Sequence, residues 1–312
     1  MKGKKEKRGI NILLKWDFES SRFNDDIVAC GFPETGDEKF GCTVVGRDPG
    51  IVYGTKQKLD AGGAKYIYAK YRTTCESETA QFYFATDLYP AMSEKQSKTY
   101  TISPNSPSYE YIIDMSDKPE WKGILNQLRF DPVGYDNRSE VGECMVEYIE
   151  VSDRFPVYGN KKDFIGTQGA NNWSYHTFDG ELAYREMQWD SEDGSWRGIY
   201  IDGLIINADI QTSRAKYASV KRWMCPAGGK YSVKCTFEQI SHGYLTDFAI
   251  KRNHVVLQKY RYSAQNRLSG EYAGEFELEK GETLNFEFCN ENYYSVVYLD
   301  ADIGISKMRN EE

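Results

Sequence analysis

The side chains best suited to do chemistry in this chain are its aromatic rings. The 312 residues include 24 Tyr, 15 Phe and 6 Trp but only 3 His. A flat ring can stack on the apolar C–H face of a sugar while nearby amides and carboxylates bind the sugar hydroxyls. The composition therefore favours a protein that binds a ligand over one that cleaves it.

In the first half of the chain, four rings stand in loop-like sequence: Tyr53, Tyr89, Trp121 and Tyr135. Tyr89 precedes a proline and Tyr135 follows a glycine, which is typical of turns. We interpret these rings as candidates for stacking on a sugar. The alternative for each is that it packs in the core or beneath a loop.

The second half is richer in such candidates. Trp173 follows two asparagines, and Tyr175 comes two residues later. Trp189 and Trp196 flank residues 190–195, an acidic segment with a glycine that has the composition of a sugar-binding rim. The alternative is a solvated turn between two strands whose ends are buried. A sixth tryptophan, in the apolar segment 219–223, is expected in the core.

Catalytic motifs are absent from the sequence. It contains neither a Gly-x-Ser-x-Gly elbow nor the Glu-x-Asp-x-x-Glu run of laminarinase-like sandwiches. His176, His242 and His254 are too far apart for metal-ligand spacing. With 47 acidic residues, some carboxylates pair by chance, so a glycoside hydrolase or a polysaccharide lyase remains the enzymatic alternative. We predict that the protein is not an enzyme.

The charge of the chain restricts its partners. The formal net charge is −8, and no basic stripe interrupts it, which argues against nucleic acid and anionic membranes. No apolar run reaches the ~18 residues of a membrane span. A neutral polysaccharide remains compatible, because stacking and hydrogen bonding need no net charge.

Seven cysteines are spread singly along the chain, at 30, 42, 75, 144, 225, 235 and 289. No Cys-x-x-Cys pair is present, so a zinc site is remote. We interpret these residues as small buried hydrophobic side chains. A disulfide such as Cys30 with Cys42 is the lesser alternative.

Short strands separated by turn signals dominate the pattern and predict an all-β protein. Expected strands of the first half lie at 65–71, 81–84, 110–114, 127–130 and 145–151, and those of the second half at 230–237, 254–260, 274–278, 283–288 and 295–305. Residues 152–163 carry Pro156, Gly159 and Asn160 and are the linker candidate. One or two helical turns are expected at 213–220. The simplest architecture is two tandem β-sandwich (jelly-roll) domains, at 10–153 and 160–312.

The segments of the first half also resemble a known family. Most of residues 12–152 look like a β-sandwich carbohydrate-binding module of the kind appended to bacterial polysaccharide-degrading enzymes. The second half is similar to galactose-binding-like sandwich domains of glycoside hydrolases and polysaccharide lyases. The first resemblance is carried by 65–71, 80–86, 111–116, 121–124 and 128–132, and the second by 168–175, 196–198, 219–223 and 226–231.

This resemblance implies a non-catalytic role: binding a polysaccharide or oligosaccharide, so that an attached enzyme or cell surface is targeted to glycan. A structural or adhesive spacer is a further alternative. The resemblance also implies an extracellular or cell-surface setting. Residues 1–8 are basic, but the apolar stretch 10–14 is too short for a secretion signal, so we expect one part of a larger multidomain protein.

The resembled modules often hold a structural calcium ion between an acid of the first strand and one of the last. Carried over to this chain, the candidate ligands are Asp17, Glu19 and Glu147. Calcium takes six to eight oxygen ligands, and carboxylates beside backbone carbonyls suit it. The alternative is a set of exposed acids at strand ends.

Overall fold

The computed structural model shows an all-β chain that divides into two compact units, residues 1–156 and 157–312. The boundary lies within the predicted linker, but residues 157–159 of that segment form a strand. The structure describes residues 12–32, 39–105, 108–134, 141–154, 156–180, 183–199, 203–214, 217–241, 245–262, 268–291 and 295–308.

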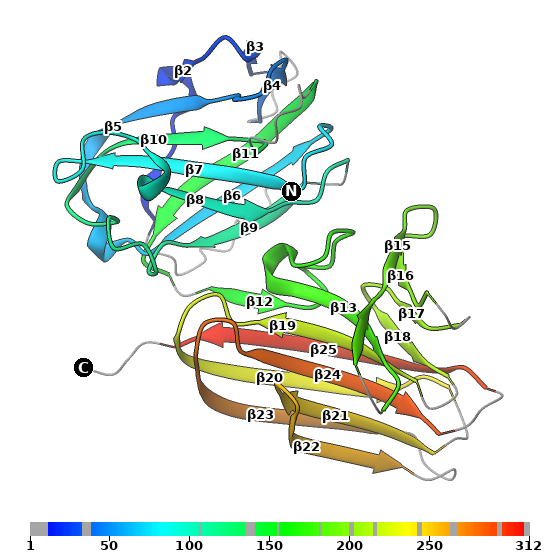
Figure 1. Ribbon diagram of the computed structural model, residues 1–312. Helices are drawn as coiled ribbons and strands as arrows, with labels where there is room; N and C mark the ends of the chain where they lie inside the picture. The colour runs from blue at the N-terminus through cyan, green and yellow to red at the C-terminus, as the bar shows by residue number, and fades with distance from the viewer. Residues whose placement is uncertain are drawn as a thin grey trace, which may run out of the picture. The chain divides into compact units, whose positions relative to one another are not determined.

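Unit 1 consists of two antiparallel sheets (Figure 1). Sheet I has the strand order β3-β4-β11-β6-β9, and β1 also pairs with β11. Sheet II has the order β2-β5-β10-β7-β8. The bounds in sheet I are β1 Ile12–Lys15, β3 Ile27–Gly31, β4 Phe40–Val44, β6 Tyr66–Thr73, β9 Tyr109–Asp114 and β11 Gly142–Ser152; those in sheet II are β2 Arg22–Phe23, β5 Ile51–Asp60, β7 Thr79–Thr86, β8 Ser97–Thr101 and β10 Ile124–Asp131.

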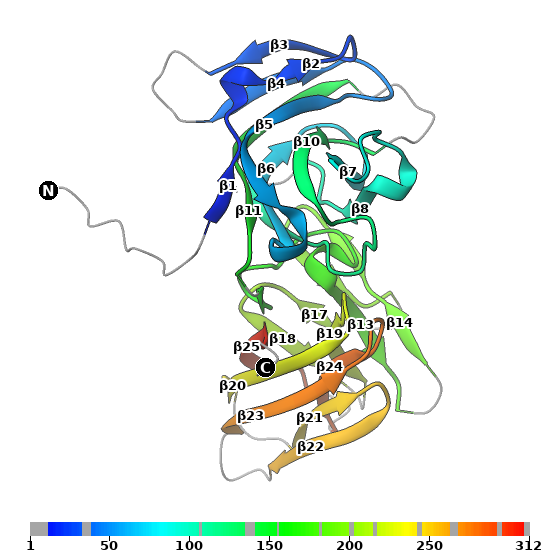
Figure 2. The same ribbon diagram turned by 90° about the vertical axis from the view of Figure 1, so that its left-hand side faces the viewer.

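Unit 2 is also built from two antiparallel sheets, whose neighbouring strands can be followed in Figure 2. Sheet III has the order β15-β16-β17-β18-β25-β20-β23, and β12 also pairs with β25; sheet IV has the order β14-β13-β19-β24-β21-β22. The bounds in sheet III are β12 Val157–Gly159, β15 Gln188–Asp190, β16 Ser195–Arg197, β17 Ile205–Ile206, β18 Ile210–Ser213, β20 Gly229–Gln239, β23 Ser269–Leu278 and β25 Val297–Lys307; those in sheet IV are β13 Trp173–Phe178, β14 Tyr184–Glu186, β19 Ala218–Met224, β21 Thr246–Arg252, β22 Val255–Tyr262 and β24 Thr283–Asn290.

The two units share one connectivity. In unit 1, β4, β11, β6 and β9 are neighbours in sheet I, and β5, β10, β7 and β8 are neighbours in sheet II. In unit 2, β18, β25, β20 and β23 follow the same order in sheet III, as do β19, β24, β21 and β22 in sheet IV. Eight successive strands thus pass between the two sheets in the same order, each time with one hairpin (β7–β8 or β21–β22) within a single sheet, which is the jelly-roll arrangement predicted for both halves.

Strand β20 shows why the sequence folds this way. Tyr231, Val233, Cys235 and Phe237 are buried, while the residues between them are exposed or half-buried. Successive side chains of a strand point to opposite faces, so the alternation places one face against the core. The predicted alternation of this strand is confirmed.

One expectation fails for a tertiary reason. The helix expected at 213–220 is wrong: β18 ends at Ser213 and β19 begins at Ala218, and a bridge pairs Arg214 with Tyr217. Pairing with β25 and β24 in the two sheets prevails over the weak helical signal. In strand β6, Tyr66 and Tyr68 on one face are buried as well as Ile67 and Ala69 on the other, and the Arg154 guanidinium covers Tyr68 at 3.3 Å from the ring centroid.

Short 3-10 helices occur among the described residues at Phe18–Ser20, Ala61–Gly63, Glu94–Gln96 and Ala170–Asn172. None of the described helices has the length and hydrophobicity that crossing a membrane requires.

Candidate functional site

Five of the rings proposed for sugar stacking are part of the hydrophobic cores. Each has at most 4% of its surface exposed, so it has no free face for a sugar ring. Burial therefore corrects the expectation that these side chains stack directly on a ligand. The five are Tyr53, Trp121, Trp173, Tyr175 and Trp196.

The contacts of these rings explain their burial. Tyr53 stacks on Trp16, with ring centroids 5.3 Å apart. Tyr175 stacks on Trp196 at 5.2 Å. The indole of Trp196 donates a hydrogen bond to the carbonyl of Ile165 at 3.1 Å, which satisfies its polar atom inside the core. The alternation of apolar and polar residues in the sequence does not reveal which aromatic rings will stack on each other.

Two of the predicted rings are half-buried. The Lys122 ammonium lies 5.7 Å from the centroid of Tyr89. Trp189 packs beside Trp196 at 5.3 Å and against Gly166, where an added Cβ would lie 2.5 Å from the indole. A role of these two rings in glycan binding stays a prediction. The fourth ring of the first half, at position 135, lies outside the described residues.

The predicted calcium ligands do not form a site of their own. Glu147 pairs with Lys70 at 2.9 Å, and Asp17 pairs with Lys56 at 3.2 Å. Glu19 is exposed. Within the described parts of the chain, no group of three or more His, Cys, Asp or Glu side chains is placed to hold a metal ion. Calcium binding therefore stays a prediction from the resemblance alone.

A pocket opens instead on the outer face of sheet IV. Ala218 of β19 and Ala249 of β21 point to this face, and their small side chains leave a hollow of about 210 Å³ between larger neighbours. The strands around them supply the walls. The pocket is lined by Phe178, Gly180, Ala218, Asp247, Ala249, Lys251, Val256, Lys259, Glu287 and Cys289.

The charged walls of this pocket are paired with one another. The Lys251 ammonium lies 2.5 Å from a carboxylate oxygen of Glu287. The Asp247 carboxylate forms ion pairs with the ammonium of Lys259 at 2.8 Å and with the guanidinium of Arg261 at 2.9 Å. The pocket therefore offers hydrogen-bond donors and acceptors side by side without an excess of either charge.

One wall is aromatic, and the sequence argument missed it. Phe178 stacks on Tyr184 with centroids 4.7 Å apart. Lys251 lies 4.8 Å from the Phe178 ring, and Arg222 lies 4.1 Å from the Tyr184 ring. His254 stacks on Tyr184 at 5.7 Å. The register pairs Phe178 of β13 with Tyr184 of β14. The sequence signal that could have predicted this wall is a hairpin with one aromatic residue on each strand.

Two titratable side chains beside this wall, His176 and Tyr184, each keep a single protonation state near neutral pH. Burial, with a contribution from Arg222, lowers the pKa of His176 to about 3, so its imidazole is neutral at neutral pH. Burial and the hydrogen bond to Glu287 raise the pKa of Tyr184, so its phenol stays a donor. Neither group is poised to exchange a proton near pH 7, as a general acid or base would be.

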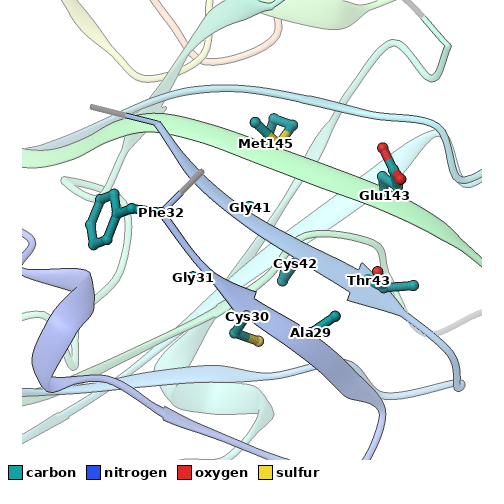
Figure 3. A pocket seen from close by; sticks show the side chains of 9 residues that line it. All are labelled: Ala29, Cys30, Gly31, Phe32, Gly41, Cys42, Thr43, Glu143 and Met145. Carbon is teal, nitrogen blue, oxygen red and sulfur yellow. The ribbon is translucent and has the colours of Figure 1, made fainter. Parts of the chain in front are cut away.

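A second pocket, in unit 1, has different walls. It lies over β3, β4 and β11, encloses about 380 Å³, and is shown in Figure 3. Phe32 stands at one end and Glu143 at the other, and Gly31 and Gly41 form the open middle. The cysteine at position 30 also lines it. Its walls carry a single charged side chain, so it lacks the matched charges of the pocket in unit 2.

Comparison with known proteins gives neither a family nor a curated relative: no family model matches the chain, and no curated protein does. Solved structures show remote likeness. The tandem CBM22-1–CBM22-2 domains of Paenibacillus barcinonensis Xyn10C have 12% identity, coverage of 96% of this chain and 98% of theirs, and a TM-score of 0.31.

The low-affinity xylan-binding module CBM86 from Roseburia intestinalis has 10% identity, with 42% of this chain and 92% of the module covered and a TM-score of 0.28. The N-terminal cellulose-binding domain of Cellulomonas fimi β-1,4-glucanase C has 10% identity, coverage of 46% and 93%, and a TM-score of 0.23. Carbohydrate-binding modules are thus frequent among these structures. Because the TM-scores are so low, we take no function from them.

Proposed function

We propose that this protein binds a neutral polysaccharide without cleaving it, and that the pocket on sheet IV holds the glycan. The observation that carries the proposal is the combination of an alanine floor, an aromatic wall and matched charges. Sugar hydroxyls donate and accept hydrogen bonds, so they can bridge an ammonium and a carboxylate that lie side by side. An anionic ligand would instead favour an excess of positive charge.

The size of the pocket supports a single sugar unit as its occupant. Pockets for drug-sized ligands enclose roughly 300–1,000 Å³, and this pocket, at about 210 Å³, is smaller. One ring of a polymer would enter it, and the rest of the polymer would continue over the sheet. Binding of this kind is weak per site and suits a module that keeps an attached enzyme or cell surface close to glycan.

The state of the carboxylates favours binding over hydrolysis. A glycosidase needs one carboxyl group as proton donor and a second as nucleophile or base. Here Glu287 is engaged by Lys251 and by the Tyr184 hydroxyl, and Asp247 by Lys259 and Arg261. These partners leave neither carboxylate free to act on a glycosidic bond. An extracellular setting within a larger protein belongs to the same proposal.

Affinity electrophoresis on a panel of plant and microbial glycans tests the proposal. We expect at least one neutral glycan to retard the wild-type chain and the Phe178→Ala variant to migrate freely. Tyr298→Ala is the matched control, because Tyr298 is an exposed ring on β25 of sheet III and should not affect retardation.

Two outcomes would overturn this function. If no glycan retards the wild-type chain, the sandwiches act as spacers or adhesive domains. If reducing sugar is released from the same panel, the chain is an enzyme. Circular dichroism of both variants separates lost binding from lost folding.

A further inference from the structure

Three adjacent strands of sheet I bring three cysteines together. Cys42 on β4 lies directly opposite Cys144 on β11. On the other side of β4, the register of β3 shifts between the pairs Val28↔Thr43 and Gly31↔Gly41. Residues 29 and 30 of β3 both fall opposite Cys42 at this irregularity, and Ala29 has φ +52° there. The chain thus forms a row Cys30–Cys42–Cys144 across three strands.

The cysteines of this row are close enough to influence one another's pKa. Cys144 on one side and Cys30 on the other are both among the groups that shift the pKa of Cys42. Cys42 and Cys144 are buried and Cys30 is half-buried, and both Cys30 and Cys42 line the pocket of unit 1. Figure 3 shows Cys30 and Cys42 on neighbouring strands below that pocket. The row therefore has one end that a small reagent can reach and one end inside the core.

We propose that Cys30 and Cys42 are a modification site, which a low-molecular-weight disulfide converts into a cross-strand disulfide. At this bulge Ala29 and Cys30 both face Cys42 on the neighbouring strand, and a disulfide between Cys30 and Cys42 requires Cα atoms about 4.4–6.8 Å apart. The bond fastens the edge strand β3 to β4 beneath the pocket. This inference concerns unit 1 and does not depend on glycan binding.

The reaction balances as two thiol–disulfide exchanges. The Cys30 thiolate attacks one sulfur of the reagent, forms a mixed disulfide and releases one reagent thiol. The Cys42 thiolate then attacks the Cys30 sulfur, forms the Cys30–Cys42 bond and releases the second reagent thiol. Two cysteine thiols are oxidised by two electrons, and one molecule of reagent disulfide is reduced to two thiols.

The surroundings suit these two roles. The hydrogen bond from Cys144 lowers the pKa of Cys42, which favours the thiolate that resolves the mixed disulfide. Burial and the neighbouring Cys42 raise the pKa of Cys30 to about 12, so the first exchange is slow at neutral pH. We expect its rate to rise about tenfold per pH unit below that pKa. Cys144 acts as a positioning residue and forms no bond.

The test is to incubate the folded full-length chain with oxidised glutathione, trap the remaining thiols by alkylation and map the peptides by mass spectrometry. We expect a linked Cys30–Cys42 peptide. Cys289 is the internal control: it is also half-buried beside a pocket, and burial raises its pKa to about 11, but no thiol is among the groups that shift it. It should carry at most a glutathione adduct.

Variants separate the steps. In Cys42→Ser, we expect Cys30 to accumulate as the glutathione adduct. In Cys144→Ala, we expect the same disulfide to form with a slower second step and a pH profile displaced to higher pH, which a merely structural residue would not cause. The proposal is overturned if Cys42 stays open to alkylation while Cys30 carries glutathione, if neither reacts, or if Cys42 links to Cys144.

Discussion

Sheets II and IV occupy equivalent places in the two jelly rolls, yet their outer faces differ. In sheet IV, Ala249 lies in the middle of β21 and Ala218 at the start of β19, and the pocket lies beside both. In sheet II, Tyr83 on β7 lies opposite Arg129 on β10, and the guanidinium covers the ring at 5.3 Å. Strands with the same connectivity thus carry a pocket on the outer face of sheet IV and an aromatic ring covered by a guanidinium on the outer face of sheet II.

The polar side chains on the outer faces of sheets II and IV differ in the same way. In sheet II, Arg129 is bonded to Asp131 at 2.6 Å, and the amide of Gln81 donates to Glu94 at 3.0 Å and to Ser97 at 2.8 Å. These polar side chains therefore form their hydrogen bonds and ion pairs with one another on the outer face of sheet II. In sheet IV, the matched charges stand around a hollow. The comparison teaches that the size of the side chains on the outer face decides whether that face of a jelly roll carries a pocket.

The largest effect is expected from closing the hollow. Ala249→Trp fills the floor of the pocket, and we expect affinity for the retained glycan to fall by about a hundredfold or more. Thr99→Trp adds the same ring to an exposed position of β8, the strand of sheet II equivalent to β22, and should leave affinity unchanged. Isothermal titration of both variants measures the effect. Equal loss in both, or none in Ala249→Trp, would contradict the assignment of the site to unit 2.

The interiors of the units offer a second contrast. Strand β19 places Lys221 in the core of unit 2, fully buried, and its ammonium has no hydrogen-bond partner among the residues that the structure describes. The equivalent strand β5 places Ile51 and Tyr53 in the core of unit 1. Because an unpaired buried charge is costly, we expect Lys221→Met to raise the free energy of unfolding by about 1–3 kcal/mol at pH 7.

The pH dependence of this gain has a definite sign. Burial lowers the pKa of Lys221 to about 8 from its ordinary 10.5. Between these values, the unfolded wild type binds a proton that the folded state lacks, so wild-type stability rises with pH by up to about 1.4 kcal/mol per unit. The advantage of Lys221→Met should therefore shrink from pH 8 to pH 10. Urea denaturation across this range tests it, and a constant difference would disprove the role of titration.

A smaller contrast concerns two buried tryptophans. The indole of Trp121 in unit 1 donates to the Ala64 carbonyl at 2.5 Å, whereas the indole nitrogen of Trp173 in unit 2 has no partner within the described part of the chain. Trp121→Phe removes a hydrogen bond and Trp173→Phe removes none. We expect Trp121→Phe to be more destabilising by about 1–2 kcal/mol in equilibrium denaturation. The opposite order would show that cavity size, and not the hydrogen bond, controls the cost.

Much of the fold could be predicted from local pattern. The alternation in 230–237 predicted β20, and the turn residues after 151 predicted a boundary close to that of the two units. The aromatic site could not be predicted in the same way. Trp173 and Trp196 carry the sequence features of a binding rim, but the sandwich buries both, and Phe178 and Tyr184 meet at the surface without a local motif.

By itself, the sequence determined that this chain is built from strands with one apolar face and that two such sets follow each other, because side-chain alternation along a strand is local. Only the tertiary structure decided which rings remain at the surface, where alanines leave a hollow, and which cysteines stand side by side. Those features depend on strand pairing between residues far apart in the chain, and pairing assigns each side chain its neighbours.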